Sequence, residues 1–305
     1  MVMQNLPQDD PEQDTPARHQ VAKRSTLVSV VVNLFLTAVQ VVVGVLAGSQ
    51  ALVADGIHSL SDLIADFVVL LANQHSRKEA DDDHHYGHHR YETAASFVLG
   101  GLLLAVGIGM LWSAVTRLSS PETIAEVKPV ALYVALVALA SKELLFRYML
   151  AAAERVRSSM LVANAWHART DAASSLVVAV GIVGNLLGYP LLDPVAALIV
   201  GFMVAHMGWE FAWDALNDLM DRSASEEHIA QIREVLLAAP GVLGVHDLRT
   251  RKMGDMIMVD VHLEVDGDLS VREGHDIAVS ARERVMKQLP VLDVLAHLDP
   301  VDHHD

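Results

Sequence analysis

Six apolar segments, each about as long as a bilayer-spanning helix, dominate the first 220 residues of this 305-residue chain. A helix needs about 20 mainly apolar residues to cross a membrane, so each segment predicts a transmembrane helix. The segments are Leu27–Gly48, Ala51–Asn73, Ala94–Val115, Val130–Leu150, Met160–Leu187 and Pro194–Leu216. They predict an all-α bundle of six transmembrane helices over residues 24–222. A Gln-, Asp- and Pro-rich tail, residues 1–23, is expected to be disordered and cytoplasmic.

Lysine and arginine residues are concentrated in alternate loops, and this asymmetry predicts the orientation. The richer loops contain Arg18, Lys23, Arg24, Arg77, Lys78, Arg90, Arg147, Arg155 and Arg157, whereas the opposing loops contain only Arg117 and Lys128. Cytoplasmic loops carry the excess of positive charge in membrane proteins. Both termini are therefore expected in the cytoplasm.

The composition excludes several kinds of site and partner. The chain has no cysteine, which excludes zinc fingers, iron–sulfur clusters, disulfide frameworks and thiol catalysis. Its formal net charge is −16 and it has no Lys/Arg-rich block, which argues against nucleic-acid binding. Residues 223–305 contribute 16 acidic and 8 basic residues, a net charge of −8.

Residues 223–305 are predicted to form a small cytoplasmic α+β domain with the order αββαβ. The predicted helices are Ser225–Ala239 and Ser270–Gln288, and the predicted strands are Val242–Arg251, Met256–Val265 and Val291–Leu298. A domain of about 80 residues has a small core, so a bound metal ion or dimerisation is expected to stabilise it.

The most informative residues are ionisable groups inside two of the apolar segments. His58 and Asp62 are four residues apart, and so are His167 and Asp171. Residues at this spacing share one helix face, and an ionisable group at bilayer depth is a functional candidate by default. If the two helices face each other, two imidazoles and two carboxylates form a tetrahedral site for a divalent first-row ion, above all zinc. Interhelical hydrogen bonds or ion pairs that hold the bundle together are the alternative interpretation.

Other polar residues in the apolar segments are weaker candidates. Asp55 is expected near the outer mouth of the site, and Asp66 extends the polar stripe toward the cytoplasm. Asn33, Gln40 and Asn164 are interpreted as packing or cavity polar groups rather than as ligands.

A second cluster lies in the loop between the second and third apolar segments. Four histidines and three aspartates occur within the nine residues from Asp81 to His89. Such a cluster is expected to attract cations. Taken alone, the loop is explained equally well as a run of solvated charged residues that has only an incidental affinity for cations.

A third group is spread over the predicted C-terminal domain. It consists of His246, His262, His275, His297 and Asp299. His275 lies on a predicted helix and the other histidines lie on or beside separate strands, so their convergence does not follow from the sequence. A lone histidine in such a position is usually structural.

Four motifs together resemble the cation diffusion facilitator family, most closely its bacterial zinc and iron exporters. They are Ala54-Asp-Gly-Ile-His58-Ser-Leu-Ser-Asp62, His167-Ala-Arg-Thr-Asp171, the loop Ala80-Asp81-x-x-His84-x-x-Gly87-His88, and Gly244-Val-His246-Asp-Leu-Arg-Thr-Arg251. The resemblance covers nearly the whole chain after about Ala22. It implies a homodimer in the bacterial inner membrane, with six transmembrane helices and a cytoplasmic metallochaperone-like, ferredoxin-like domain per protomer. It also implies exchange of a cytoplasmic divalent cation for protons by alternating access.

The resemblance further implies a role for each candidate residue. The transport site is His58, Asp62, His167 and Asp171, the loop site is Asp81, His84 and His88, and the cytoplasmic sites use His246, His262, His275, His297 and Asp299. Arg90 and Asp221 match a salt bridge that holds the membrane halves of the dimer relative to each other. Zn²⁺ is the expected substrate and the expected structural or regulatory ion, with Fe²⁺, Co²⁺, Ni²⁺ and Cd²⁺ as the other candidates.

Several residues depart from the family pattern. His58 stands where some bacterial relatives carry aspartate, and resembles zinc-preferring members that discriminate against cadmium. Glu79 replaces a common proline, His85 and His89 are additions, and Arg90 replaces a common lysine. Arginine keeps the charge but offers a different hydrogen-bonding fork. These departures leave the preferred metal open.

The chemistry of the predicted sites favours a transporter over two alternatives. Metal binds neutral imidazole and ionised carboxylate, so loading releases any protons held there and metal exchanges for protons. Bound cations would also offset the −8 charge of the C-terminal domain and bring two copies together. A metallohydrolase would be expected to show a His-Glu-x-x-His or similar motif, which the sequence lacks. A membrane-bound metal sensor would not need paired ligands on two membrane helices, so we expect a transporter rather than an enzyme.

Overall fold

The computed structural model describes residues 16–301 except residues 77, 121, 123, 125 and 156–158. For residues 16–26, 69, 70, 73, 154, 155, 159–161, 163, 164 and 167 it describes the backbone alone. Contacts within the chain divide it into two units. The first is Met1–Phe67 with Gly101–Trp209, and the second is Val68–Gly100 with Glu210–Asp305.

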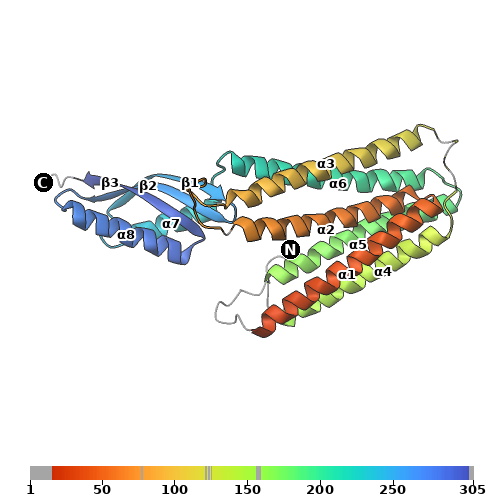
Figure 1. Ribbon diagram of the computed structural model, residues 1–305, viewed down its shortest axis with the longest axis horizontal. Helices are drawn as coiled ribbons and strands as arrows, with labels where there is room; N and C mark the ends of the chain where they lie inside the picture. Colours follow the sequence, from red (N-terminus) through yellow and green to blue (C-terminus); the bar gives the residue numbers. More distant parts are fainter. Residues whose placement is uncertain are drawn as a thin grey trace. The chain divides into compact units, whose positions relative to one another are not determined.

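In the part of the chain that the structure describes, six long helices precede the C-terminal domain (Figure 1). They are α1 (Pro16–Ala47), α2 (Gln50–Ser76), α3 (Arg90–Leu118), α4 (Val130–Arg155), α5 (Ser159–Leu186) and α6 (Leu192–Leu219). Each predicted apolar segment coincides with one of these helices and exceeds it by no more than one residue. Gly48 follows α1 at φ +76°, a left-handed conformation that glycine adopts without strain and that ends a helix.

Three of the helices meet a strict criterion of length and apolarity for crossing a membrane. Within the described residues these are Leu27–Ala47 of α1, Arg90–Leu118 and Leu192–Leu219. The helices α2, α4 and α5 are of similar length, and they carry ionisable residues within their apolar segments, among them His58, Lys142 and Asp171. The all-α architecture predicted for this part of the chain is confirmed.

Glycines allow the helices of the first unit to pack closely. At Gly56 of α2, a Cβ atom would lie 2.7 Å from Val41 Cγ2 and 3.2 Å from Gln40 Cβ of α1. At Gly107 of α3, a Cβ atom would lie 2.6 Å from the Cα atom of Ala205 in α6. A side chain at either position would collide with the neighbouring helix, so these glycines permit the contacts of α1 with α2 and of α3 with α6.

Asp193 at the start of α6 binds the N-terminus of α2. Its Oδ1 atom accepts a 2.6 Å hydrogen bond from Ser49 Oγ, and its Oδ2 atom accepts one of 2.7 Å from the backbone N–H of Gln50. A helix N-terminus has unpaired N–H groups and a partial positive charge, so a buried carboxylate stabilises it. This contact fixes the beginning of α2, the helix that carries His58 and Asp62.

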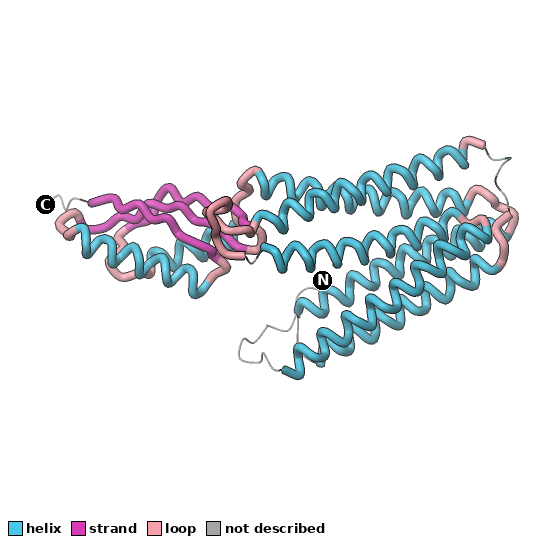
Figure 2. The backbone as a smooth tube through the Cα atoms, viewed as in Figure 1, coloured by secondary structure: helices cyan, strands magenta, loops and turns pink. Residues whose placement is uncertain are grey.

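The C-terminal domain has the predicted order αββαβ, and its strands are coloured magenta in Figure 2. The elements are α7 (Glu226–Leu237), β1 (Gly244–Met253), β2 (Met256–Asp266), α8 (Val271–Gln288) and β3 (Val291–Val301). The sheet order is β1-β2-β3, with β1 antiparallel and β3 parallel to β2. The parallel pair needs a crossover connection, which α8 supplies. β3 continues beyond its predicted end at Leu298, so Asp299 belongs to the strand.

Alternation along β2 gives the sheet one apolar face and one polar face. Val259, Val261 and Leu263 are buried in a core with Ile232 of α7 and Val285 of α8. The intervening residues, Asp260, His262 and Glu264, are partly exposed. Because successive strand residues point to opposite faces, His262 lies on the face away from the helices.

Candidate metal sites

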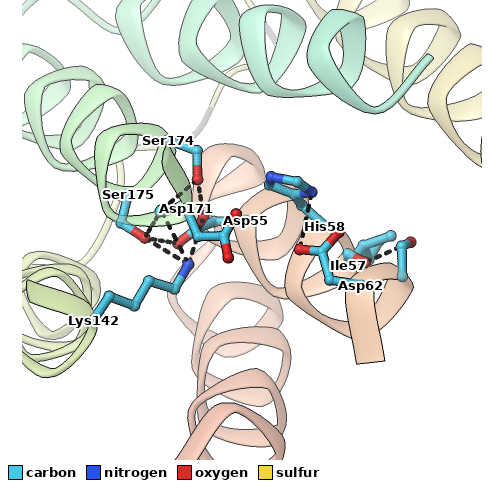
Figure 3. A network of polar contacts seen from close by, with 9 residues as sticks. Asp55, Ile57, His58, Asp62, Lys142, Asp171, Ser174 and Ser175 are labelled. Atoms are coloured by element: carbon cyan, nitrogen blue, oxygen red, sulfur yellow. Dashed lines mark hydrogen bonds and ion pairs between the residues drawn. The ribbon is translucent and has the colours of Figure 1, made fainter. Parts of the chain in front are cut away.

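His58, Asp62 and Asp171 bring one imidazole and two carboxylates together between α2 and α5 (Figure 3). One ligand atom of each residue lies within 4.8 Å of the others. His58 Nδ1 is 3.5 Å from Asp62 Oδ2, and His58 is only 5% exposed. The four-residue spacing places His58 and Asp62 on one face of α2, and α5 brings Asp171 to that face.

This group has the composition that a divalent transition-metal ion requires. Two carboxylates offset a charge of +2, and imidazole nitrogen with carboxylate oxygen is a ligand set that zinc accepts. The three described residues would fill three positions of a tetrahedral site. His167 belongs to α5, four residues before Asp171, and its side chain lies outside the described residues.

A buried ion pair that sequence reasoning misses lies beside this group. Lys142 of α4 places its Nζ atom 3.3 Å from Oδ1 of Asp55 in α2, and the two side chains are 3% and 1% exposed. Asp55 is expected near an outer mouth but is enclosed by the bundle, where Ser174 and Ser175 of α5 donate hydrogen bonds to it. The signal in the sequence is one lysine in the middle of the apolar segment Val130–Leu150. Its partner depends on which helices pack together.

The remaining polar residues of the bundle have different surroundings. Gln40 donates a hydrogen bond to Asp55 Oδ2, so it belongs to the polar group around that carboxylate. Asn33 Nδ2 lies 3.5 Å from Ser29 Oγ of the same helix. Asp66 is exposed and belongs to none of the three ligand groups found among the described residues. The side chain of Asn164 lies outside the described part of the chain.

The loop group combines Asp81, His84 and His88, whose ligand atoms also lie within 4.8 Å of one another. Asp81 Oδ1 accepts hydrogen bonds from the backbone N–H groups of Asp83 and His84, which closes a tight turn. His84 Nδ1 and His88 Nε2 each lie 3.5 Å from an oxygen of Asp81. His88 is 3% exposed, so one ligand of this surface loop is buried.

Lys78 contacts the same carboxylate. Its Nζ atom donates a 2.6 Å hydrogen bond to Asp81 Oδ2, the oxygen that His88 approaches. This hydrogen bond holds the pKa of the Asp81 carboxyl well below its usual range, so the carboxylate is ionised at neutral pH. The added residues His85 and His89 are not members of the loop group.

The third group lies on the polar face of the C-terminal sheet. Strand register pairs His246 of β1 with His262 of β2, and His262 with His297 of β3. Asp299 Oδ2 lies 2.8 Å from His262 Nδ1 and 3.0 Å from His246 Nε2, and its Oδ1 atom is 3.3 Å from His297 Nε2. The structure therefore brings three histidines to one carboxylate. Of these, His246, His262 and Asp299 place their ligand atoms within 4.8 Å of one another.

The carboxylate of Asp299 is stabilised by its neighbours. The hydrogen bond with His262 holds the pKa of Asp299 below its usual value, and the charges of the adjacent histidines act in the same direction. His275 is exposed on α8 and is not a member of this group. The terminal His303 and His304 lie outside the described residues.

Arg90 and Asp221 form an ion pair within the chain, between Nη2 and Oδ1. Arg90 also donates a 3.4 Å hydrogen bond to the backbone carbonyl of Leu219, and its Nε atom lies 3.2 Å from Met253 Sδ. Asp221 adopts a φ of 62°, in the left-handed region. The pair therefore ties the start of α3 to the end of α6 inside the second unit, and its predicted role in a dimer stays a prediction.

Two family profiles match the chain. The profile of the cation efflux transmembrane domain matches residues 26–220, and the profile of the cation efflux protein cytoplasmic domain matches residues 224–301. The first match includes α2, α4 and α5, so these helices belong to the transmembrane region despite their ionisable residues.

Several known proteins are similar along most of the chain. Metal tolerance protein C1 of Arabidopsis thaliana is 34% identical over 88% of this chain and 60% of its own length. An uncharacterised transporter of Methanocaldococcus jannaschii is 32% identical over 92% of this chain and 99% of its own length. The manganese efflux system protein MneP of Bacillus subtilis is 30% identical over 93% of this chain and 97% of its own length. The chain thus spans three fifths of the plant relative and nearly all of the two microbial relatives.

Proposed function

Because this chain belongs to the cation diffusion facilitator family of divalent-cation efflux transporters, we propose that it exports Zn²⁺ from the cytoplasm in exchange for protons. The protein acts as a homodimer in the bacterial inner membrane, with both termini in the cytoplasm. The orientation is supported by the concentration of lysine and arginine in alternate loops.

The approach of His58, Asp62 and Asp171 within 4.8 Å is the observation that carries this proposal. With His167 as the fourth ligand, the transport site contains two imidazoles and two carboxylates. The two carboxylates balance the charge of the ion, so the loaded site faces the surrounding apolar helices without a large net charge.

Proton exchange follows from the same ligands. Zn²⁺ binds the neutral form of imidazole and the ionised form of carboxylate, so protons and metal compete for the site. Protons that enter from the outer side displace the ion, and the proton gradient drives export by alternating access.

The loop and C-terminal groups serve binding and assembly. Asp81, His84 and His88 hold an ion at the loop, and His246, His262 and Asp299 hold one on the polar face of the sheet. Residues 223–305 carry a net charge of −8, which opposes the approach of two copies. Bound cations reduce this repulsion and bring the two C-terminal domains of a dimer together.

The histidine content favours zinc over manganese. Imidazole suits zinc, whereas sites made of carboxylates, carbonyls and water suit manganese. The relative MneP is named for manganese efflux, so Mn²⁺ is the second candidate. The Irving–Williams order favours zinc over manganese at most sites, so the flux of each ion rather than its affinity identifies the physiological ion.

The test is zinc flux into proteoliposomes with and without a pH gradient. We expect flux to depend on the gradient and to fall by at least tenfold in His58→Ala and Asp171→Asn. His206→Ala is the matched control, since His206 also lies in a membrane helix but stacks on Phe202, outside the three ligand groups. Zinc flux that is unchanged by the pH gradient and by both ligand substitutions would overturn the proposal. Binding without flux would favour the metal-sensor alternative.

A further inference from the structure

Lys142 is a buried cation inside the helix bundle. Counted over the whole residue, it is 2% exposed, and its partner Asp55 is 0% exposed. Removing charges from water is costly, so a buried ion pair persists only with good geometry and completed hydrogen bonds. In a membrane domain, ionisable residues at such depth mark functional sites.

The hydrogen bonds of this pair are complete. Lys142 Nζ lies 3.3 Å from Asp55 Oδ1, 2.8 Å from Ser175 Oγ and 3.5 Å from the backbone oxygen of Asp171. These partners use all three N–H donors of an ammonium group. Asp55 accepts further hydrogen bonds from Gln40, Ser174 and Ser175. The pair is therefore held by α1, α2, α4 and α5 in one arrangement.

The pair lies about one helical turn from the candidate transport ligands (Figure 3). Asp55 precedes His58 by three residues on α2, a rise of roughly 4.5 Å. On the other side, the ammonium of Lys142 contacts the backbone of Asp171 itself. Both charges are near enough to act on a cation at this site, although neither belongs to the ligand group.

The charges of the site balance only when Lys142 is included. Asp55, Asp62 and Asp171 together present −3 to a divalent cation, and Lys142 reduces this to −2. One uncompensated charge has a large effect in an interior of low dielectric constant. A site at −3 would hold a divalent ion too tightly for efficient release, whereas a site at −1 would bind it poorly.

We propose that Lys142 is a resident counter-ion to Asp55 that fixes the charge of the transport site at −2. Lys142 is a positioning residue, since it acts on the ion through charge and through Asp171 and does not touch the ion. The inference rests on the proposed transport function. It goes beyond that function by assigning a role to two charges that bind no metal.

The test compares zinc flux for the wild type, Lys142→Met, Asp55→Asn and the double variant Asp55→Asn/Lys142→Met. We expect Lys142→Met to lower the apparent KM and the maximal rate, and Asp55→Asn to raise the apparent KM, each by about tenfold or more. The double variant restores the charge of −2, so its apparent KM returns to within about threefold of the wild type. Shifts of KM in opposite directions are the signature, because a merely structural pair would lower the rate of both single variants alike.

Lys128→Met is the matched control. Lys128 is an exposed lysine of the same unit, and its Nζ atom binds the backbone oxygen of Leu46. We expect its apparent KM to equal that of the wild type.

Two outcomes separate this inference from the proposed function. If Asp171→Asn abolishes flux but both single variants shift KM in the same direction or leave it unchanged, the counter-ion role is wrong and the transport function stands. If the wild type carries no zinc flux, or Asp171→Asn leaves it intact, the proposed function itself fails. If Lys142→Met does not fold, the other two variants still test the role. An apparent KM that rises in Asp55→Asn and returns to near the wild-type value in the double variant supports it. An apparent KM that stays raised in the double variant overturns the role.

Discussion

The carboxylate of Asp193 and the hydroxyl of Ser49 are joined by a 2.6 Å hydrogen bond between residues that are each 1% exposed. Asp193→Ala removes the acceptor for Ser49 and for the backbone N–H of Gln50. Leaving such buried donors unpaired costs about 1–3 kcal/mol, so we expect a lower Tm in detergent. Asp214→Ala is the control, since its ion pair with Arg222 is exposed and should change Tm little. Equal Tm values for the two variants would contradict the structural role of Asp193.

Replacement of His58 by aspartate should change the metal preference. The substitution turns a mixed nitrogen and oxygen site into one richer in carboxylate, which is more favourable to manganese than the original ligand set. We expect the ratio of Mn²⁺ to Zn²⁺ flux to rise by about tenfold, the scale on which changes around a metal site alter affinity. Flux of each ion into proteoliposomes measures the ratio, with His206→Ala as the control. An unchanged ratio would mean that His58 does not select the ion.

Zinc binding by the C-terminal group should weaken as the pH falls. The pKa of Asp299 is held below its usual value. The ionised carboxylate therefore stabilises the folded protein at every pH above the usual pKa, and this contribution is lost only as the pH falls through the lowered pKa. The carboxylate therefore stays ionised between pH 7.5 and 5.5. Zinc binds the neutral form of imidazole, so protons compete with the ion and we expect a lower affinity at pH 5.5 than at pH 7.5.

Calorimetric titration of the detergent-solubilised protein measures this binding. Zinc binding at the C-terminal group is the binding event that His262→Ala removes from the titration. His275→Ala retains it, since His275 lies outside the group. A component with the same affinity at both pH values would show that the histidines are not its ligands.

Lys78 should weaken metal binding at the loop. Its ammonium occupies Asp81 Oδ2 at 2.6 Å, so an incoming ion must displace it. The lysine side chain is 56% exposed, and exposed ion pairs are weak, so we expect Lys78→Met to raise the loop affinity only about two- to fivefold. The gain should shrink at high salt, which screens the pair in the wild type. Zinc titration of Lys78→Met and of the control Lys128→Met measures the effect, and a lower affinity would contradict it.

The helices and the ligand motifs could be predicted because they depend on spacing along one chain segment. Runs of apolar residues locate α1 to α6, and the separation of His58 from Asp62 places both on one face of α2. The alternation Val259, Val261, Leu263 likewise predicts which face of β2 is buried.

The other features depend on which segments meet. Nothing in the spacing of Lys142 indicates Asp55 as its partner, because that contact depends on how the helices are arranged in the bundle and on the reach of the lysine side chain from α4 to α2. The register between strands, which includes an irregularity between His246 and Arg249, decides that His246 faces His262. His275 is exposed on α8, so the sequence alone does not separate it from the histidines of the sheet.

The glycines at helix contacts constrain the chain in a way that ligand chemistry does not. A Cβ atom at Gly56 or Gly107 would lie within 2.7 Å of an atom of the adjoining helix. A saturation mutagenesis library selected for metal resistance should therefore lose nearly every substitution at these two positions, even alanine. Their tolerance profile would match that of metal ligands although they bind nothing. Positions of this protein that tolerate no substitution thus fall into two classes, those that coordinate an ion and those where two helix backbones are in contact.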